Sequence, residues 1–372
     1  MIINVHVIRN YGPNVVNRGE DGEPKSLVYG GKKRTRVSSQ ARKHKWRTSD
    51  TFRQAWDDGL LSVRTRKTSQ IIRDRLIAAG YSEAVADRVR EELGKFSSCA
   101  VKEIRAYSKA DIDAIMAAVK KQLEDESMKT KIANIEAGKK VDKFLDKKAI
   151  DGFEISKLTP IDVALFGRMM AERTVMNVPA SVYVSHAFST HESMEDVDFF
   201  SATDDLLGIG EEDTGAAHIN NISFDTACMY EFAYIDTDIL MDNLKDMENK
   251  EEMLKTVIET LIPAMVLETP DGKQTTFASR PAPSAVLIEM QDKKTVFDYA
   301  NAFEEPVWKE PIVKNSVAAL VEECESTDKM YGEYRGLTKR LWMSSVDGVE
   351  PENATKVDTL AQLVHAIVDA VQ

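Results

Sequence analysis

The sequence predicts an α+β protein, and its hydrophobic pattern is the reason. Apolar and polar side chains alternate over residues 2–9 and, most clearly, over the thirteen residues 222–234, as they do in half-buried strands. Segments with helical spacing of apolar residues stand between the strand-like segments. The expected elements are, in order, a strand at 2–9, a helix from Gln40 to about Trp56, strands at 181–190 and 222–234, a helix that begins at Asp242 and a strand at 284–290. This βαββαβ order is the ferredoxin-like plan that RNA-recognition domains also use.

A helical insertion is expected between the first helix and the second strand. Residues 60–157 are rich in charged residues, and Ser82 and Ser108 precede apolar positions at helical spacing, which is typical of helix N-caps. The Lys- and Glu-rich part, residues 120–151, is expected to be solvated. Further helices are expected at 161–172, 313–324 and 355–371.

An acidic excursion, residues 192–221, separates the second and third expected strands. It lies in a stretch from Thr174 to Leu244 that has no Lys or Arg and carries 14 carboxylates. Phe199 and Phe200 stand within it, and two arrangements are open: a protruding hairpin with an apolar tip, or rings folded back onto the core. The expected organisation is residues 1–58 as the first part of the sheet domain, 59–157 as the helical insertion, 158–191 as the second part of the sheet domain, 192–221 as the hairpin, and 222–372 as the third part with the C-terminal helices.

The charge is unevenly distributed along the chain. The 372 residues carry 61 Asp and Glu against 49 Lys and Arg, a formal net charge of −12. Residues 1–75 hold 17 basic and 7 acidic side chains (net +10), whereas the remaining residues hold 32 and 54 (net −22). An acidic protein with one basic segment is a candidate for binding a polyanion through that segment. The three cysteines match no disulfide or zinc spacing, and no signal peptide or membrane span is recognisable, so we expect a cytoplasmic protein.

The strongest local feature is the segment Gly30–Arg47, which is rich in Lys and Arg and has no acidic residue. Its two glycines allow close backbone approach, and the hydroxyl and N–H groups at the following helix start can hold a phosphate. Basic residues in the first turns oppose the helix dipole, so local stability does not explain them. The segment predicts phosphate or nucleic-acid binding, with a solvated helix that pairs with acidic neighbours as the alternative. It lacks the glycine spacing of a Walker A loop, and no RNP1 aromatic motif is present.

Other chemistry has little support in the sequence. His186, His191 and His218, with Glu192, Asp196 and Asp198, are candidate metal ligands, but the step of five from His186 to His191 fits neither one strand face nor a zincin helix. No nucleophile elbow is present, and the adjacent Asp204 and Asp205 suit a solvated surface better than a catalytic pair. We therefore expect that the protein is not an enzyme and that it has no metal site and no cofactor.

Several segments carry a resemblance to a known family. They are the N-terminal strand and the segments Val15–Arg18, Tyr29–Gln40, Asp162–Met169, Ser185–His191, Asp196–Leu206 and Ala300–Glu304. In order, and over about residues 3–305, they resemble the CasC (Cse-type) family. CasC is the repeated backbone subunit of Cascade, the type I-E CRISPR surveillance complex. The helical insertion and the C-terminal tail match poorly, so no role is carried over to them.

The resemblance implies an RRM-like palm with a helical fingers insertion and a β-hairpin thumb. Members of the family do no chemistry, and several copies polymerise side by side along a CRISPR guide RNA. The thumb of one copy reaches its neighbour and interrupts the guide–target duplex at regular steps. The implied partners are the guide RNA, the target DNA strand, neighbouring copies and other Cascade subunits, in a prokaryotic cytoplasm and without a membrane.

The resemblance also implies roles for individual residues. Positions that hold the guide backbone in the family match Arg18, Lys25, Ser38, Ser39, Gln40, Lys43 and Arg47. Lys32, Arg34, Arg36 and Arg168, also in matching segments, complete the expected RNA contacts. His44 stands where the family usually has a basic residue. Met169 matches an apolar residue packed by the displaced base, and Phe199 and Phe200 match the bulky pair on the thumb.

The function expected from the sequence is therefore that of a non-catalytic, guide-RNA-binding backbone subunit. Two alternatives stay open at this point. One is an RNA-cleaving backbone homologue that uses a loop Asp. The other is a structural homo-oligomer without nucleic acid, in which the basic segment docks on the acidic surface of a neighbour.

Overall fold

The computed structural model describes residues 1–99, 104–154, 156–170, 173–202 and 218–371. The chain forms two compact units, which we name by their content. The sheet unit comprises Met1–Gln54, Val182–Asp238 and Glu251–Gln372, and the helical unit comprises Ala55–Ser181 and Ile239–Lys250. The chain therefore leaves the sheet unit twice and returns to it each time.

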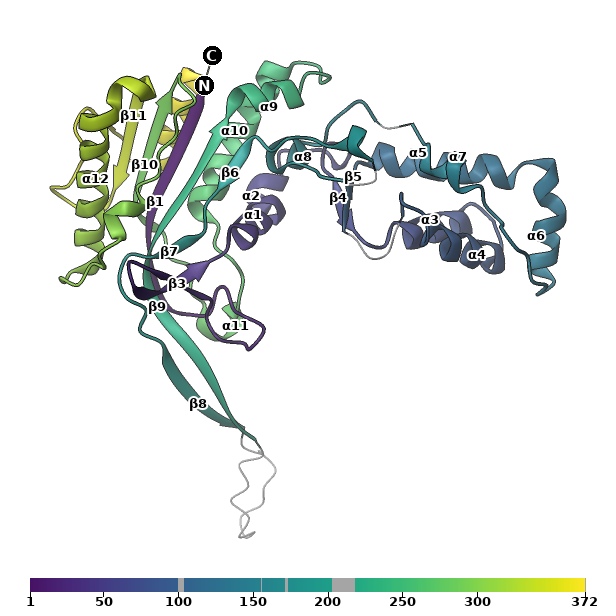
Figure 1. Ribbon diagram of the computed structural model, residues 1–372, viewed down its shortest axis with the longest axis horizontal. Helices are drawn as coiled ribbons and strands as arrows, with labels where there is room; N and C mark the ends of the chain where they lie inside the picture. The colour runs from purple at the N-terminus through teal and green to yellow at the C-terminus, as the bar shows by residue number, and fades with distance from the viewer. Residues whose placement is uncertain (100–103, 155, 171–172, 203–217, 372) are drawn as a thin grey trace, which may run out of the picture. The chain divides into compact units, whose positions relative to one another are not determined.

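A ten-stranded sheet spans the described part of the sheet unit (Figure 1). Its order is β12-β11-β10-β1-β9-β7-β3-β2, and β6 and β8 also pair with β9. All pairs are antiparallel except β11–β12. The strands are β1 (Ile2–Asn14), β2 (Ser26–Tyr29), β3 (Lys32–Val37), β6 (Val182–Val184), β7 (Ala187–Ser189), β8 (Asp196–Ala202), β9 (His218–Asp236), β10 (Pro283–Gln291), β11 (Leu337–Ser344) and β12 (Thr355–Lys356).

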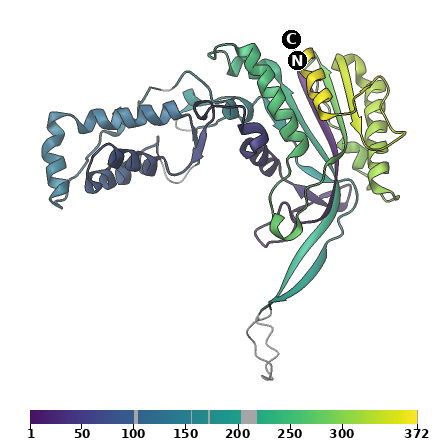
Figure 2. The ribbon, with the colours of Figure 1, turned by 180° about the vertical axis from the view of Figure 1, so that it is seen from behind.

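Helices cover both faces of this sheet. Figures 1 and 2 show α12 on one face and α1 and α10 on the other. Under α12, Tyr230 and Phe232 of β9 join Val317 and Leu320 in one buried apolar cluster. The helices of this unit are α1 (Ser39–Thr48), α2 (Asp50–Arg53), α10 (Lys250–Leu267), α11 (Gln274–Phe277), α12 (Ile312–Arg335) and α13 (Leu360–Ala370), with a 3₁₀ turn at Ala300–Phe303.

Strand β9 is shared by the sheet and by a hairpin. Its C-terminal part pairs with β1, in a register that runs from Ile2 opposite Asp236 to Asn14 opposite Asp225. Its N-terminal part, His218 to Phe224, pairs with β8. One strand of 19 residues therefore carries the sheet's central pairing into a two-stranded arm that extends away from the sheet (Figure 1).

The arm exposes its aromatic residues. Phe199 and Phe200 on β8 are 70% and 51% exposed. Of the two arrangements that the sequence leaves open, the structure has the protruding one. Asp204, Asp205 and the acidic stretch 208–213 lie outside the described residues.

Several expected elements are shorter than the sequence suggests, because local groups end them. The expected helix Gln40–Trp56 stops after Thr48 and restarts at Asp50, because the Ser49 hydroxyl accepts a hydrogen bond from the Phe52 N–H (3.3 Å). The helix expected at 161–172 ends at Phe166, where Gly167 adopts a φ of 75°. The strand expected at 181–190 is divided into β6 and β7, with Ser185 and His186 between them.

The helical unit is a set of short helices around a two-stranded ladder. Ser108 caps α5 as expected, in a reciprocal pair with Asp111 that joins each backbone N–H to the other side chain (2.9 and 3.0 Å). Ser82 stands at the cap position of α4, but its hydroxyl donates to Glu136 instead (2.8 Å). The elements are β4 (Val63–Thr65), β5 (Arg105–Tyr107), α3 (Thr68–Ala78), α4 (Glu83–Leu93), α5 (Lys109–Leu123), α6 (Lys129–Glu136), α7 (Lys147–Asp151), α8 (Ile161–Phe166) and α9 (Thr237–Asn243), with 3₁₀ turns at Asp58–Leu60, Glu126–Met128 and Thr174–Met176.

Residues 158–181, expected from the sequence in the sheet domain, belong to the helical unit. The buried carboxylate of Asp162 in α8 accepts hydrogen bonds from the Ser62 N–H (2.7 Å) and hydroxyl (2.6 Å). Such contacts hold α8 against the start of β4. The hydrophobic pattern of the sequence does not predict them, because the two partners are far apart along the chain. Among the described residues, no helix is both long and apolar enough to span a bilayer.

A buried ionic cluster joins four elements on the α12 side of the sheet. Glu289 of β10 accepts hydrogen bonds from Arg335 of α12 (2.6 Å), Arg340 of β11 (2.7 Å) and the Tyr299 hydroxyl (2.7 Å). Burial alone would raise the pKa of Glu289, and His6 of β1 together with the two guanidinium groups lowers it well below its ordinary value. Removing one member of such a cluster leaves buried charge without compensation.

We expect Glu289→Gln to lower the free energy of unfolding by about 3 kcal/mol or more, because the amide keeps the shape but removes the buried negative charge and leaves Arg335 and Arg340 to share the carboxylate of Asp328. The lowered pKa means that this contribution is present above the unfolded pKa of a Glu, about 4.3, and is lost as pH falls through the folded value. Urea denaturation at pH 7 and at acid pH measures both effects. Glu322→Gln, an exposed change on α12, should leave the midpoint within about 0.5 kcal/mol.

Candidate nucleic-acid interface

The β2–β3 hairpin turns at two glycines, each in a backbone conformation that other residues rarely adopt. Gly30 and Gly31 have φ values of 58° and 73°, the sign that a two-residue hairpin turn with the favoured twist requires at both positions. A Cβ atom on Gly30 would lie 1.7 Å from the carbonyl oxygen of Glu304, whereas one on Gly31 would meet nothing within 4 Å. Gly30 therefore lets the hairpin lie directly against the segment that ends at Glu304.

Helix α1 begins after its N-cap residue Ser38 and has no acidic residue in its first turn. The Ser38 hydroxyl accepts a hydrogen bond from the Ala41 N–H (3.3 Å), and the Ser38 N–H donates to the Asn17 side chain (2.9 Å). Ser38 and Ser39 are each only 7% exposed, whereas Gln40 is exposed. The serines thus shape the helix start, and its electropositive end is available to an anion.

Backbone hydrogen bonds bring a loop and a strand end beside this helix start. The Lys25 N–H donates to the Asn17 carbonyl (2.8 Å), and the Arg36 N–H donates to the Lys25 carbonyl (2.7 Å). The Arg36 guanidinium donates to Nδ1 of His186, between β6 and β7 (2.9 Å). Residues distant in sequence therefore meet at one place on the sheet unit.

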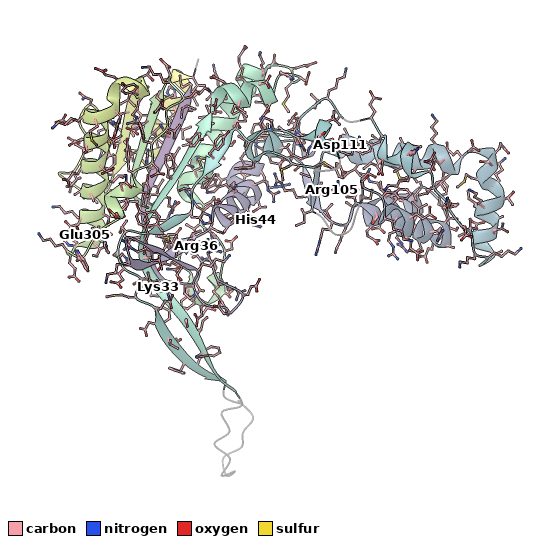
Figure 3. All side chains as sticks on the ribbon, in the orientation of Figure 1. Lys33, Arg36, His44, Arg105, Asp111 and Glu305 are labelled. Atoms are coloured by element: carbon pink, nitrogen blue, oxygen red, sulfur yellow. The ribbon has the colours of Figure 1, made fainter. Side chains whose placement is uncertain are left out.

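We call this region the basic surface. It comprises Arg18, Lys25, Arg36, Lys43, Arg47 and His186. Arg18 is exposed, and Arg47 donates to Nδ1 of the exposed His44 (3.4 Å). Figure 3 shows Arg36 on β3 and His44 on α1. Five cations on neighbouring elements form an electropositive surface that suits a chain of phosphates.

His186 reports the field of this surface. Burial and then the charges of Arg36, Arg42, Lys25 and Lys43 lower its pKa below the ordinary value. Because the Arg36 guanidinium only donates, Nδ1 is the acceptor, and the remaining ring nitrogen, Nε2, carries the proton in the neutral form. The sequence indicates either a metal ligand or a hydrogen-bonded residue at a strand end for His186, and it does not predict the place of this ring among the cations.

Two arginines expected to contact RNA are instead structural. The Arg34 side chain is fully buried, and its guanidinium donates to the carbonyls of Ser189 (2.9 Å), Phe303 (2.8 Å) and Glu304 (3.1 Å). Arg168 in the helical unit is 7% exposed and donates to backbone carbonyls there. Both expectations are corrected, because these guanidinium groups satisfy buried carbonyls and are not presented to solvent.

The lysines at the flanks of the basic surface are paired with acids. Lys32 lies 3.0 Å from Glu192, and Lys33 lies 2.8 Å from Glu195, whose carboxylate raises the pKa of Lys33. Figure 3 labels Lys33 near the base of the β8–β9 arm. On α1, Lys45 pairs with Asp271 (3.0 Å) and Glu268 (3.4 Å). The acidic neighbours thus neutralise the flanks, and the expected RNA contact of Lys32 is shared with an ion pair.

The residues expected to act on a displaced base lie on separate units. Met169 is in the helical unit and is 90% exposed. Phe199 and Phe200 are on the arm of the sheet unit. Each is an exposed apolar side chain, which is the property their expected role requires.

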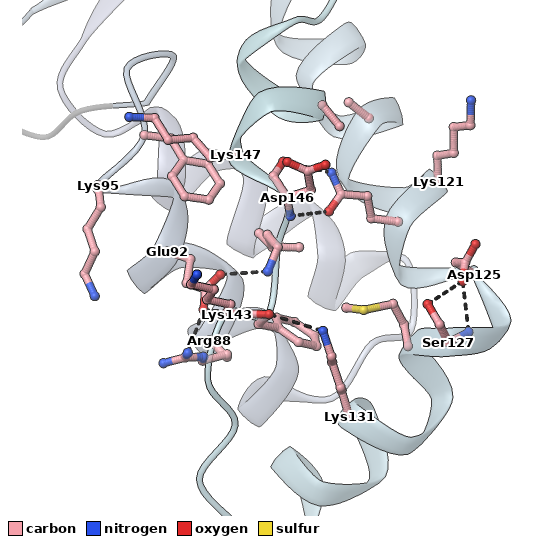
Figure 4. Close-up of a pocket in the computed structure, with 17 residues that line it drawn as sticks. Arg88, Glu92, Lys95, Lys121, Asp125, Ser127, Lys131, Lys143, Asp146 and Lys147 are labelled. Atoms are coloured by element: carbon pink, nitrogen blue, oxygen red, sulfur yellow. Dashed lines mark hydrogen bonds and ion pairs between the residues drawn. The ribbon is translucent and has the colours of Figure 1, made fainter.

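A basic pocket in the helical unit was not anticipated from the sequence, where residues 120–151 were expected to be solvated (Figure 4). Its volume is about 1180 Å³, and its basic residues are Arg88, Lys95, Lys121, Lys131, Lys143 and Lys147. Its three carboxylates already accept hydrogen bonds: Glu92 from Arg88 and from the N–H groups of Phe144 and Leu145, Asp125 from Ser127, and Asp146 from the Lys148 N–H. The pocket therefore carries a surplus of positive charge.

Metal chemistry has no site in the part of the chain that the structure describes, where no group of three or more His, Cys, Asp or Glu side chains could hold an ion. His191 makes two backbone contacts: Nε2 accepts from the Cys228 N–H (3.1 Å), and Nδ1 donates to the Glu192 carbonyl (2.8 Å). The side chain of His218 lies outside the described residues.

Solved structures with this architecture define the class of protein that the chain resembles. A chain from a "CRISPR RNA-guided surveillance complex, pre-nicking" is 25% identical, with a TM-score of 0.81 and full coverage of both chains. A chain from a "CRISPR RNA-guided surveillance complex" is 21% identical, with a TM-score of 0.63 and full coverage, a likeness of fold alone. No functionally curated protein matches the chain.

The family follows from the sequence as a whole. The family described as CT1975-like protein matches residues 3–368. The chain belongs to this family, whose match spans both the sheet unit and the helical unit.

We expect Gly30→Ala to destabilise the protein by about 2 kcal/mol or more, because the new Cβ needs a left-handed conformation and meets the Glu304 carbonyl. Gly31→Ala is the matched control, since it carries the conformational cost, about 1 kcal/mol, without the contact. Urea denaturation of the two variants measures the difference. Equal losses would contradict a packing role for Gly30.

Proposed function

We propose that this protein is a guide-RNA-binding backbone subunit of a CRISPR surveillance complex of the Cascade kind, type I-E. The observation that carries the proposal is the basic surface, where five cations from the 18–25 loop, β3 and α1 stand beside the start of helix α1, which Ser38 caps and which has no acidic residue in its first turn. The likeness to a chain of a solved CRISPR RNA-guided surveillance complex supports it.

The chemistry of the surface suits the sugar–phosphate backbone of an RNA. Lys and Arg side chains and the free N–H groups at a helix start bind phosphates whatever the base. A subunit that must accept every guide sequence needs contacts of this kind, because base pairing carries the sequence information. The salt dependence of binding should therefore be steep.

The strand order supports a ferredoxin-like palm. β10, β1, β9 and β7 are neighbours in the sheet, and the chain visits them in the order β1, α1, β7, β9, α10, β10. We assign the β8–β9 arm as the thumb and the helical unit as the fingers. The exposed Phe199 and Phe200 on the thumb are suited to separating stacked bases, which costs less when an apolar side chain replaces the lost stacking.

In the proposed assembly, copies of the chain lie side by side along the guide RNA in a prokaryotic cytoplasm. The thumb of one copy interrupts the duplex between guide and target DNA, and Met169 packs beside the displaced base. The role is binding and display, and no catalytic step is assigned to any residue.

Purification tests the proposal most directly. We expect RNA to co-purify with the protein when guide RNA is co-expressed, so that the absorbance ratio at 260 and 280 nm falls after ribonuclease treatment. Oligomers that survive ribonuclease, with no salt-sensitive RNA binding, would refute the proposal and favour a structural homo-oligomer.

Charge reversal on the basic surface should weaken guide binding. We expect Arg18→Glu and Lys43→Glu each to lower affinity on the order of tenfold at low salt and to reduce the salt slope by about 1. Fluorescence anisotropy over a salt series measures both quantities. The matched control is Lys329→Glu, an exposed charge reversal on α12 across the sheet, which should leave affinity and slope unchanged.

The thumb aromatics should act on the target duplex and not on the guide. We expect Phe200→Ala to leave guide affinity within about twofold, because its ring lies outside the basic surface and phosphate contacts dominate affinity. The same variant should blur the regular spacing of reactive bases when the assembled complex pairs with target DNA, as read by chemical probing. Phe199→Ala, measured in parallel, identifies which ring is the wedge. Equal loss of guide and target binding in Phe200→Ala would contradict this division of roles.

A further inference from the structure

The connection between β7 and β8, residues 190–195, is held to its neighbours by a backbone hydrogen bond and by ion pairs. The Ser193 N–H donates to the Lys33 carbonyl of β3 (2.8 Å), and the ion pairs Lys32–Glu192 and Lys33–Glu195 add to it. The connection is therefore fastened to β3, the strand that carries Arg36 of the basic surface.

One buried carboxylate links three segments at the base of the arm. Asp225 of β9 is 1% exposed and stands directly after the residues that pair with β8. Its Oδ2 accepts from the Thr35 hydroxyl of β3 and from the Ser193 hydroxyl of the connection (2.6 Å). Its Oδ1 accepts from the Thr226 N–H (2.7 Å). The Asp225 carbonyl also accepts from the Asn14 amide at the end of β1 (3.0 Å).

Asp225 lies at the point on β9 where the sheet ends and the arm begins. The strand is paired with β1 up to Asn14 opposite Asp225, and with β8 from Phe224 outward. At the junction, a strand flanked by partners becomes one side of a two-stranded arm, and such an arm is free to bend unless side chains hold it. Only the contacts at the base can set its direction.

We infer that Asp225 is the positioning residue that sets the direction of the β8–β9 arm relative to the basic surface, by accepting hydrogen bonds from Thr35 of β3 and Ser193 of the connection. Thr35 lies directly between Arg34, which anchors β3 to the core, and Arg36, which faces the basic surface. The same strand thus holds both the binding surface and the arm. The functional consequence rests on the proposed function: the arm meets a guide–target duplex at a fixed place because Asp225 holds it there.

Asp225 needs both of its carboxylate oxygens, because each of them accepts a hydrogen bond. An Asn at this position would have to place its amide oxygen at Oδ2 to accept from both hydroxyl groups. Its NH₂ group would then face the Thr226 N–H, so that two donors would stand against each other. Reversing the amide would satisfy Thr226 and turn the NH₂ group toward the Thr35 and Ser193 hydroxyl groups, which would then have to accept from a neutral donor. Asp225→Asn therefore replaces two hydrogen bonds to a charged acceptor with weaker neutral ones, without changing the size of the side chain.

A distance measurement on the free protein tests the link. The three native cysteines are buried, so that spin labels placed by Val28→Cys on β2 and Asp198→Cys on β8, both exposed sites, report the arm alone. We expect one narrow distance distribution in the parent and a clearly broader one in Asp225→Asn. Amide exchange along β8 should become faster by about tenfold in the same variant.

Conservative variants separate positioning from a general loss of structure. Thr35→Val removes the hydroxyl and should broaden the distribution, whereas Thr35→Ser keeps the donor and should restore it. Asp196→Asn, an exposed carboxylate on β8, is the matched control and should leave the distribution narrow. If Asp225→Asn does not fold, the two Thr35 variants decide. A narrow distribution in both Asp225→Asn and Thr35→Val would overturn the inference.

A second readout connects the link to function. In assembled complexes, Asp225→Asn should leave guide affinity within about twofold, because the cations of the basic surface are untouched, while the regular spacing of probed target bases becomes irregular. If the parent protein binds no RNA, the proposed function fails, and the distance measurement still stands by itself. If RNA binds and only the distances fail to respond, the positioning role fails alone.

Discussion

The pairing of β9 is the constraint on which the rest of the sheet unit depends. A single strand of 19 residues pairs with β1 over its inner part and with β8 over its outer part. Any change in its register would move the core face and the arm together, because side chains alternate along a strand with a period of two. The long alternation from Ile222 to Tyr234 therefore sets the faces of the central strand and continues across Asp225, the point where the arm begins.

Ion pairs decide which basic side chains of this protein present an uncompensated charge at the surface. Lys32, Lys33 and Lys45 face carboxylates from segments distant in sequence, and Arg34 serves buried carbonyls. Lys25, Arg36 and Lys43 lie close enough to His186 that, after burial, their charges lower its pKa. Acidic residues from elsewhere in the chain thus neutralise part of the basic segment, and the positive charge that is left is confined to the basic surface. A protein with this division binds a polyanion at one place and repels it elsewhere.

Strand β3 contributes Arg36 to the basic surface and also contacts the base of the arm, so that one strand supports both features. Arg36 at one position of β3 points to the basic surface, and Thr35 beside it donates to Asp225 at the base of the arm. Adjacent residues of a strand face opposite sides of the sheet, so that one strand serves two sites without crowding either. Membership of the CT1975-like family and the likeness to a surveillance-complex chain support a guide-RNA-binding role of the Cascade kind.

Sequence order alone was enough to predict the order of the strands at 2–9, 181–190, 222–234 and 284–290 with the helices between them, the helical insertion and the basic segment, because these follow from local alternation, capping residues and charge runs. It left open whether the acidic segment protrudes, and it did not predict β2, β3, β11 and β12. Contacts in three dimensions were needed to show which cations reach the surface, that residues 158–181 belong to the helical unit, and that Asp225 and His186 matter. Arg34 and Arg36 look alike in the sequence, two positions apart. Their partners, Ser189, Phe303 and His186, lie more than a hundred residues away, and burial depends on such partners and not on the residue's own neighbours in the chain.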